Sequence, residues 1–232
     1  MKNTITAFAL ITGLSLSGQT KKEGIIEYEQ VIDLHASLSK DQEAYKAFIP
    51  KTSASTVQVF FKDNAYKVEY LPLETKSKDG SSKVSVQFTS GGGDRLVDKD
   101  KKIVYSYHKS GDKNYYTEEP IKKETVVIDK KTTKKILNYA CYKATITASD
   151  NESYEIWFTS DPGVQANPMF DGVTEGLVLE IRNKKINLLA KKIEFKKTEG
   201  KKYTVPLSFK KISAEQAEDL DAEQVESSRQ GH

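Results

Sequence analysis

The 232-residue sequence has one cysteine, three histidines and one tryptophan, and these small numbers exclude several classes of protein. A single cysteine cannot form an intramolecular disulfide. Together with three scattered histidines it cannot supply the four ligands of a local zinc site. No Gly-x-Ser-x-Gly motif occurs, so nothing indicates a serine hydrolase. We therefore predict a protein without disulfides, metal or other cofactors, and not an enzyme.

The sequence also lacks a strong charge of one sign and a long apolar run. Lys and Arg total 36 and Asp and Glu total 33, which leaves a formal charge of +3 spread along the chain. A nucleic-acid-binding protein usually concentrates its basic residues in one patch, so nucleic acid is not the expected partner. The longest apolar run, Ile5–Leu16, is shorter than the about 20 residues that a membrane-spanning helix needs, so no transmembrane segment is predicted.

The N-terminal residues have the pattern of a signal peptide. Lys2 supplies the positive charge, Ile5–Leu16 supplies the apolar region, and the small residues Ser17 and Gly18 precede polar sequence. We predict a signal peptide over residues 1–19. No cysteine stands near the cleavage region for lipid attachment, so we expect an exported, soluble protein in the periplasm or outside the cell.

The rest of the chain is dominated by alternation of apolar and polar residues with a period of two, which is typical of half-buried strands. Short turn sequences such as Asp63-Asn64 and Ser110-Gly111-Asp112 separate these segments and favour hairpins between antiparallel neighbours. The alternating apolar positions are Ile26, Tyr28, Ile32 and Leu34; Val57, Val59 and Phe61; Tyr66, Val68 and Tyr70; Val84, Val86 and Phe88; Ile103, Tyr105 and Tyr107; Tyr142, Ala144 and Ile146; Tyr154, Ile156 and Phe158; Leu177, Leu179 and Ile181; and Val205, Leu207 and Phe209.

Helical signals are few. Ser39–Gln42 has the form of a capping box, and apolar residues at helical spacing follow before Pro50, which predicts a short helix ending near Ile49 and lying across one face of the sheet. A second capping sequence begins at Ser213 in an acidic segment. We predict a mainly β fold: a single antiparallel domain over residues 20–212 with one or two short helices, followed by a weakly helical or disordered tail over residues 213–232.

Two features of the sequence could indicate a catalytic site: the single cysteine and a set of glutamates. Cys141 lies within an apolar, strand-like pattern, so we interpret it as a buried and inert thiol rather than a nucleophile. Carboxylate pairs could be drawn from Glu152, Glu155, Glu175 and Glu180, but the sequence sets no distance between them, and we assign them no role.

Three segments resemble the GLPGLI family. They are Asn138–Ala144, with its Cys-x-Lys-Ala pattern, Tyr154–Thr159, and Phe170–Ile181, in which Gly172 and Gly176 bound a loop that leads into an apolar strand. The resemblance covers about a fifth of the chain, and the loop lacks the proline of the family pattern. It implies an envelope or secreted protein of Bacteroidetes-type bacteria, with no assigned activity. Related envelope families are similar to outer-membrane lipoprotein carriers, which implies a strongly curved sheet in the form of a half-barrel.

The function predicted from these observations is the binding of a lipid-like or other apolar ligand on the concave face of the sheet, without catalysis. Aromatic side chains could line that face with their hydroxyl groups near its mouth. The predicted ligand-binding residues are Tyr28, Tyr66, Tyr70, Tyr105, Tyr107, Trp157 and Phe158. The alternative is an envelope scaffold or interaction protein with a solid core and a protein partner.

Overall fold

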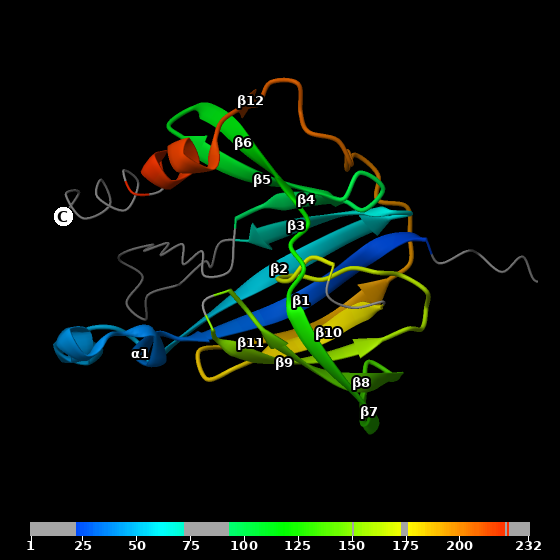
Figure 1. The fold of residues 1–232 in the computed structure, drawn as a ribbon, viewed down its shortest axis with the longest axis horizontal. Coiled ribbons are helices and arrows are strands. Elements are labelled where there is room, and N and C mark those ends of the chain that lie inside the picture. Colours follow the sequence, from blue (N-terminus) through cyan, green and yellow to red (C-terminus); the bar gives the residue numbers. More distant parts are fainter. Residues whose placement is uncertain (1–21, 72–92, 150, 173–175, 221, 223–232) are drawn as a thin grey trace, which may run out of the picture.

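The computed structural model describes residues 22–71, 93–149, 151–172, 176–220 and 222, and in these ranges the protein is mainly β, as predicted (Figure 1). Between the first two strands lie helix α1 (Leu34–Ser37) and the 3-10 helix η1 (Lys40–Ala47), and residues 214–220 are also helical. The strands are β1 Glu23–Asp33, β2 Thr52–Lys62, β3 Ala65–Leu71, β4 Arg95–Asp98, β5 Ile103–Ser110, β6 Lys113–Pro120, β7 Thr125–Ile136, β8 Tyr139–Thr147, β9 Ser153–Thr159, β10 Leu177–Arg182, β11 Ile186–Glu194 and β12 Lys210–Lys211. The predicted signal peptide and the strand predicted at Val84–Phe88 lie outside the described residues.

All twelve strands belong to one sheet, in the order β12-β6-β5-β4-β3-β2-β1-β11-β10-β9-β8-β7. Neighbouring strands pair antiparallel except β12, which pairs parallel with β6. The sheet stays open, because β12 and β7 stand at its two ends. The predicted half-barrel with uniformly antiparallel strands therefore matches only in part.

The connection between β6 and β7 shows that the sheet bends. These strands lie ten steps apart in the sheet order, which is about 48 Å in a flat sheet. Only residues 121–124 join them, and five Cα–Cα steps span at most about 18 Å. The ends of the sheet must therefore approach each other, and Figure 1 shows the green segment between β6 and β7 crossing the molecule.

The bend encloses one face of the sheet, which we call the inner face. Its side chains include Ile26, Val59 and Val68, which are cross-strand neighbours in β1, β2 and β3 and are fully buried. The segment 160–172 packs on this face, with the Phe170 ring 4.8 Å from that of Tyr154. The core is therefore built from the inner face of the sheet and from a loop that occupies it.

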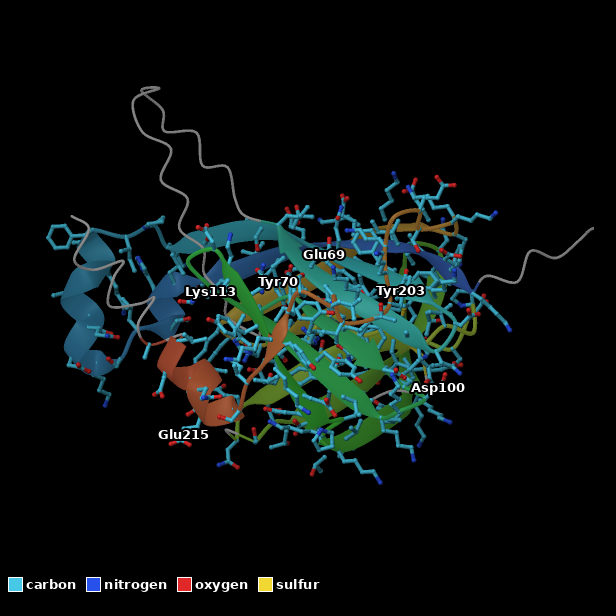
Figure 2. The ribbon with its side chains drawn as sticks, turned by 90° about the horizontal axis from the view of Figure 1, so that it is seen from above. Glu69, Tyr70, Asp100, Lys113, Tyr203 and Glu215 are labelled. Carbon is cyan, nitrogen blue, oxygen red and sulfur yellow. The ribbon has the colours of Figure 1, made fainter. Side chains whose placement is uncertain are left out.

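The opposite, outer face is crossed by the segment that follows β11. Lys201 Nζ lies 2.7 and 2.8 Å from the two carboxylate oxygens of Glu69 and 4.1 Å from the centre of the Phe60 ring (Glu69 is labelled in Figure 2). Further along, the Phe209 ring packs edge-on against Tyr107. The strand predicted at Val205–Phe209 is absent, because a turn joins Phe209 N to Pro206 O, and pairing begins only at β12.

The predicted helix ending near Ile49 does not cover the sheet. In its place α1 and η1 lie beyond the ends of β1 and β2 (Figure 1), and the side chain of Phe48 is 84% exposed. Most residues of η1 are polar, so this element has no apolar stripe to bury against the strands. In the part of the chain that the structure describes, every helix is too short or too polar to span a lipid bilayer.

Candidate functional site

The seven aromatic residues predicted to line one face lie on both faces of the sheet. Tyr28, Tyr66, Tyr70 and Phe158 point to the inner face, whereas Tyr105, Tyr107 and Trp157 belong to the outer face. Side chains alternate along a strand, so the consecutive residues Trp157 and Phe158 cannot share a face. The structure therefore does not bring the seven together.

The inner tyrosines are tied into the scaffold. The Tyr28 hydroxyl donates to Val178 O at 2.6 Å, and its side chain is 1% exposed. Burial raises the pKa of Tyr28 far above its usual value. The Tyr70 hydroxyl donates to Pro168 O at 3.2 Å, in the segment that occupies the inner face. The Tyr28 hydroxyl therefore ties β1 to β10, and the Tyr70 hydroxyl holds that segment against the sheet.

A buried ion pair lies between β4 and the same segment. Arg95 Nε is 3.2 Å from Asp171 Oδ2, and the side chains are 6% and 12% exposed. The Tyr66 hydroxyl donates to Asp171 Oδ1 at 2.6 Å. Burial on its own would lower the pKa of Arg95, but the neighbouring Asp171 carboxylate raises it, so the guanidinium stays charged. We call Arg95, Asp171, Tyr66, Tyr70 and Asn167 the inner polar cluster.

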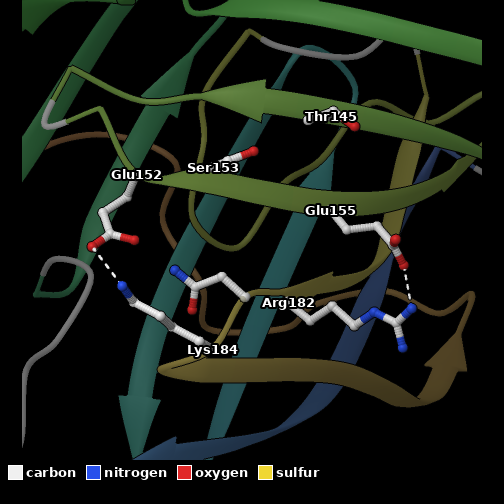
Figure 3. A pocket seen from close by; sticks show the side chains of 7 residues that line it. Thr145, Glu152, Ser153, Glu155, Arg182 and Lys184 are labelled. Atoms are coloured by element: carbon white, nitrogen blue, oxygen red, sulfur yellow. Dashed lines mark ion pairs between the residues drawn. The ribbon is translucent and has the colours of Figure 1, made fainter. Parts of the chain in front are cut away.

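The outer face carries an open groove of about 470 Å³ where the turns after β8 and β10 meet (Figure 3). Thr145 of β8, Glu155 of β9 and Arg182 of β10 are cross-strand neighbours and form its floor. The complete lining is Thr145, Glu152, Ser153, Glu155, Arg182, Asn183 and Lys184. We call this set the outer groove.

Glu155 is a strongly perturbed carboxylate of the outer groove. Its oxygens lie 2.5 Å from Arg182 Nη2, 2.6 Å from Lys143 Nζ and 2.8 Å from Trp157 Nε1. Burial on its own would raise the pKa of Glu155, but hydrogen bonds from Lys143, Trp157 and Arg182 outweigh it and lower the pKa to about 2. Glu155 is therefore ionised at neutral pH and serves as a hydrogen-bond acceptor, not as a proton donor.

The turn side of the outer groove is also polar. Glu152 Oε1 lies 2.8 Å from Lys185 Nζ and 3.9 Å from Lys184 Nζ. Asn183 Oδ1 accepts from the backbone N–H groups of Lys185 and Ile186, which fixes the orientation of the amide. Asn183 Nδ2 is buried and has no hydrogen-bond partner among the described residues. The groove thus offers carboxylate acceptors and the Arg182 and Lys184 donors to a polar ligand.

A reactive thiol and a metal site have less support than a polar ligand in the outer groove. Cys141 is fully buried, as predicted, and burial raises the pKa of its thiol to about 11. Among the described residues, no three His, Cys, Asp or Glu side chains gather into a group that could hold a metal ion. The sequence analysis considered the groove residues Glu152 and Glu155, but only the folded chain places Glu155 beside Arg182 and Glu152 beside Lys184 and Lys185. The signal available in the sequence was that each of three strands carries a polar residue, Thr145, Glu155 or Arg182, at a position that points away from the core.

Comparisons with known proteins identify the family. The model of the family described as "N-glycanase peptide, N-terminal domain" matches residues 95–217. No curated protein sequence matches the chain. The solved structure of PNGF-II in space group C2 aligns with a TM-score of 0.58 and 17% identity over 86% of this chain and 32% of that chain. The structure of PNGF-II in space group P21 gives a TM-score of 0.59, 17% identity and shares of 86% and 33%.

These likenesses show a shared fold, and the chain spans about a third of the length of the PNGF-II chains. The family match overturns the predicted kinship with GLPGLI proteins, whose resemblance rested on short strand and glycine patterns. It also overturns the prediction of a lipid-binding or scaffold protein and the prediction that the protein is not an enzyme, because the family is named for an N-glycanase.

Proposed function

Because this chain belongs to the family of N-glycanase peptide N-terminal domains, we propose that it takes part in the removal of N-glycans by binding the sugar of the substrate. The family match carries this proposal. The matched range, residues 95–217, includes β8, β9 and β10, the strands that build the outer groove.

The chemistry of the outer groove suits a glycan. Sugar hydroxyl groups donate and accept hydrogen bonds at once, and the groove presents the ionised Glu155 as acceptor with Arg182 and Lys184 as donors. Val127 of β7 is paired with Thr145 beside the groove and is 66% exposed, so it can contact the apolar face of a sugar ring. An open groove also lets an oligosaccharide chain continue beyond the bound unit.

The test is an NMR titration of the full chain with a high-mannose glycopeptide. We expect chemical-shift changes at Thr145, Glu155 and Arg182, and none with the same peptide lacking its glycan. Arg182→Ala removes a donor and should weaken binding about fivefold.

Lys191→Ala is the matched control, because Lys191 forms an exposed ion pair with Glu29 on β1 and β11, outside the groove. It should leave the affinity unchanged. Equal affinity for the peptide with and without its glycan, or equal weakening by both variants, would overturn the proposal.

We also propose export of the protein, with a signal peptide over residues 1–19, a β domain over residues 20–212 and a tail from residue 213. The apolar run Ile5–Leu16 supports this division. N-terminal sequencing of secreted material should begin near residue 20, and material that begins at Met1 would contradict it.

A further inference from the structure

Strand β7 forms one end of the sheet and has a neighbouring strand on one side only. Within the residues that the structure describes, it pairs with β8 alone, and it lies at the lower border of the molecule in Figure 1. A strand at the end of a sheet presents a row of unpaired backbone N–H and C=O groups to which another strand can bind. β7 is twelve residues long, whereas β12 at the opposite end has two residues. The β7 end therefore offers the longer edge.

The two halves of β7 differ in how they are protected. The second half contains the register shift between Asp129 and Thr133 and four lysines. Irregular pairing and lysines are the usual means by which proteins keep an edge strand from binding another strand. The first half, Thr125–Asp129, has neither, and it carries Val127 and Ile128, which are 66% and 43% exposed. Exposed apolar side chains on an unprotected edge indicate a contact surface.

This first half is complementary to a second copy of itself. Side chains alternate between the faces of a sheet, so an antiparallel pairing of two identical strands keeps the faces aligned only when it is centred on one residue. A pairing centred on Val127 places Val126 of each copy opposite Ile128 of the other. It also places Glu124, directly before β7, opposite Lys130, so that opposite charges meet.

The neighbouring registers fit less well. A pairing centred on Val126 would place Glu124 opposite Ile128. A pairing centred on Ile128 would place Val126 opposite Lys130. Each sets a charged side chain against an apolar one. The sequence around Val127 therefore selects a single register.

The pairing would extend the apolar core. Val126 is half-buried and already packs against the core, and Ile128 is the cross-strand neighbour of the fully buried Ala144. Contact with the second copy would remove the exposed part of Ile128 from water. Only residues 124–130 of each copy meet, so the interface is small and the dimer should be weak and reversible.

We propose that this protein forms a homodimer in which residues 124–130 of one copy pair antiparallel with the same residues of a second copy, in the register centred on Val127. The two sheets then continue into each other. The two Val127 side chains meet on the outer face, where each lies beside Thr145 of an outer groove. The proposal rests on the edge of β7 and not on the proposed function.

The experiment is sedimentation velocity of the full chain at concentrations from about 5 to about 500 µM, a range that suits a weak complex. We expect the average mass to rise toward that of two chains. Ile128→Lys sets a charge opposite Val126 and should keep the protein monomeric throughout. Leu207→Lys is the matched control, because Leu207 is an exposed apolar residue outside β7, and it should dimerise as the original protein does. A monomer at the highest concentration, or equal loss with both variants, would overturn the proposal.

A charge exchange tests the register. The dimer contains the pair of Glu124 and Lys130 twice, so Glu124→Lys turns two attractions into two repulsions and should weaken dimerisation about tenfold. Adding Lys130→Glu exchanges the charges and should restore the affinity to within about threefold. A double variant as weak as Glu124→Lys alone would overturn the proposed pairing.

Two further outcomes separate this proposal from other uses of the edge and from the proposed function. If the peptide without glycan shifts the backbone amides of Thr125–Asp129 while the protein sediments as a monomer, the edge binds extended peptide and the homodimer is rejected. Arg182→Ala lies outside the paired residues and should dimerise normally. A failure of glycopeptide binding therefore leaves the dimer standing, and a monomeric protein leaves the outer groove with its role.

Discussion

The inner and outer faces of the sheet use the same ion-pair chemistry in different surroundings. On the inner face, Arg95 and Asp171 form a pair whose side chains are 6% and 12% exposed. On the outer face, Glu155 bonds Lys143 and Arg182, whose side chains are 33% and 50% exposed. Water screens the outer pairs and leaves them adaptable, whereas the inner pair cannot lose one member without leaving a buried charge. The comparison indicates that the inner pair locks the fold and the outer pairs are available to a ligand.

The largest effect should come from breaking the inner pair. Asp171→Asn leaves the buried guanidinium of Arg95 without a counter-ion, and we expect a loss of about 3 kcal/mol in the free energy of unfolding. Urea unfolding followed by tryptophan fluorescence measures it. A loss below about 1 kcal/mol, in the range of exposed pairs, would remove the distinction between the faces.

A smaller loss should follow from removing one hydroxyl of the inner polar cluster. Tyr66→Phe deletes the 2.6 Å hydrogen bond to the charged Asp171 and should cost about 2 kcal/mol. Tyr28→Phe is the matched control, because its hydroxyl donates to the neutral carbonyl of Val178, also at 2.6 Å, and it should cost about 1 kcal/mol. The same urea experiment compares them, and equal losses would show that the charge of Asp171 adds nothing.

On the outer face, Glu155→Gln should lower the stability at neutral pH by about the amount that acid removes from the original protein. The folded state lowers the pKa of Glu155 from 4.5 to about 2. The stabilisation is therefore complete above about pH 4.5 and is lost as the pH falls toward 2. We expect the variant to lose at most about 1 kcal/mol at pH 7 and to show a shallower decline in stability between pH 4.5 and 2. Parallel stability curves for the variant and the original protein would contradict this.

The smallest effect should come from the exposed pair of Lys191 and Glu29, whose side chains are 48% and 50% exposed. Lys191→Ala should change the free energy of unfolding by less than about 0.5 kcal/mol. Thermal unfolding in low and in high salt checks it, and a larger change that disappears in high salt would show that outer pairs act as a network.

Much of the strand content followed from the sequence, because period-two alternation needs only one buried face. The pairs Val57 and Val59 or Ile156 and Phe158 lie on the inner face as their spacing predicts. The same rule, applied strictly, would have separated Trp157 from Phe158. It could not separate Tyr66 from Tyr105, because the two lie in different strands and only the register through Leu96 and Lys67 places them on opposite faces.

The mistaken family kinship has a physical cause in the glycines that carried part of it. A side chain at Gly172, which has a φ of +80°, would approach Ile121 of the crossing segment to 2.6 Å. A side chain at Gly176 would collide with the backbone of Thr159 and approach the Phe158 ring to 3.3 Å. Close packing of strands and loops imposes such glycines on many β proteins, so they identify the architecture rather than the family.

The sequence alone determined that the chain forms strands and that Cys141 is buried. These properties depend on the alternation, composition and spacing of residues that are neighbours along the chain. The tertiary structure decided the rest: the joining of β1 to β11, the burial of Arg95 against Asp171, and the meeting of Glu155 with Arg182. Each of these depends on contacts between segments that lie far apart in the sequence. Packing sets those contacts and the strand register, and neither can be read from local sequence.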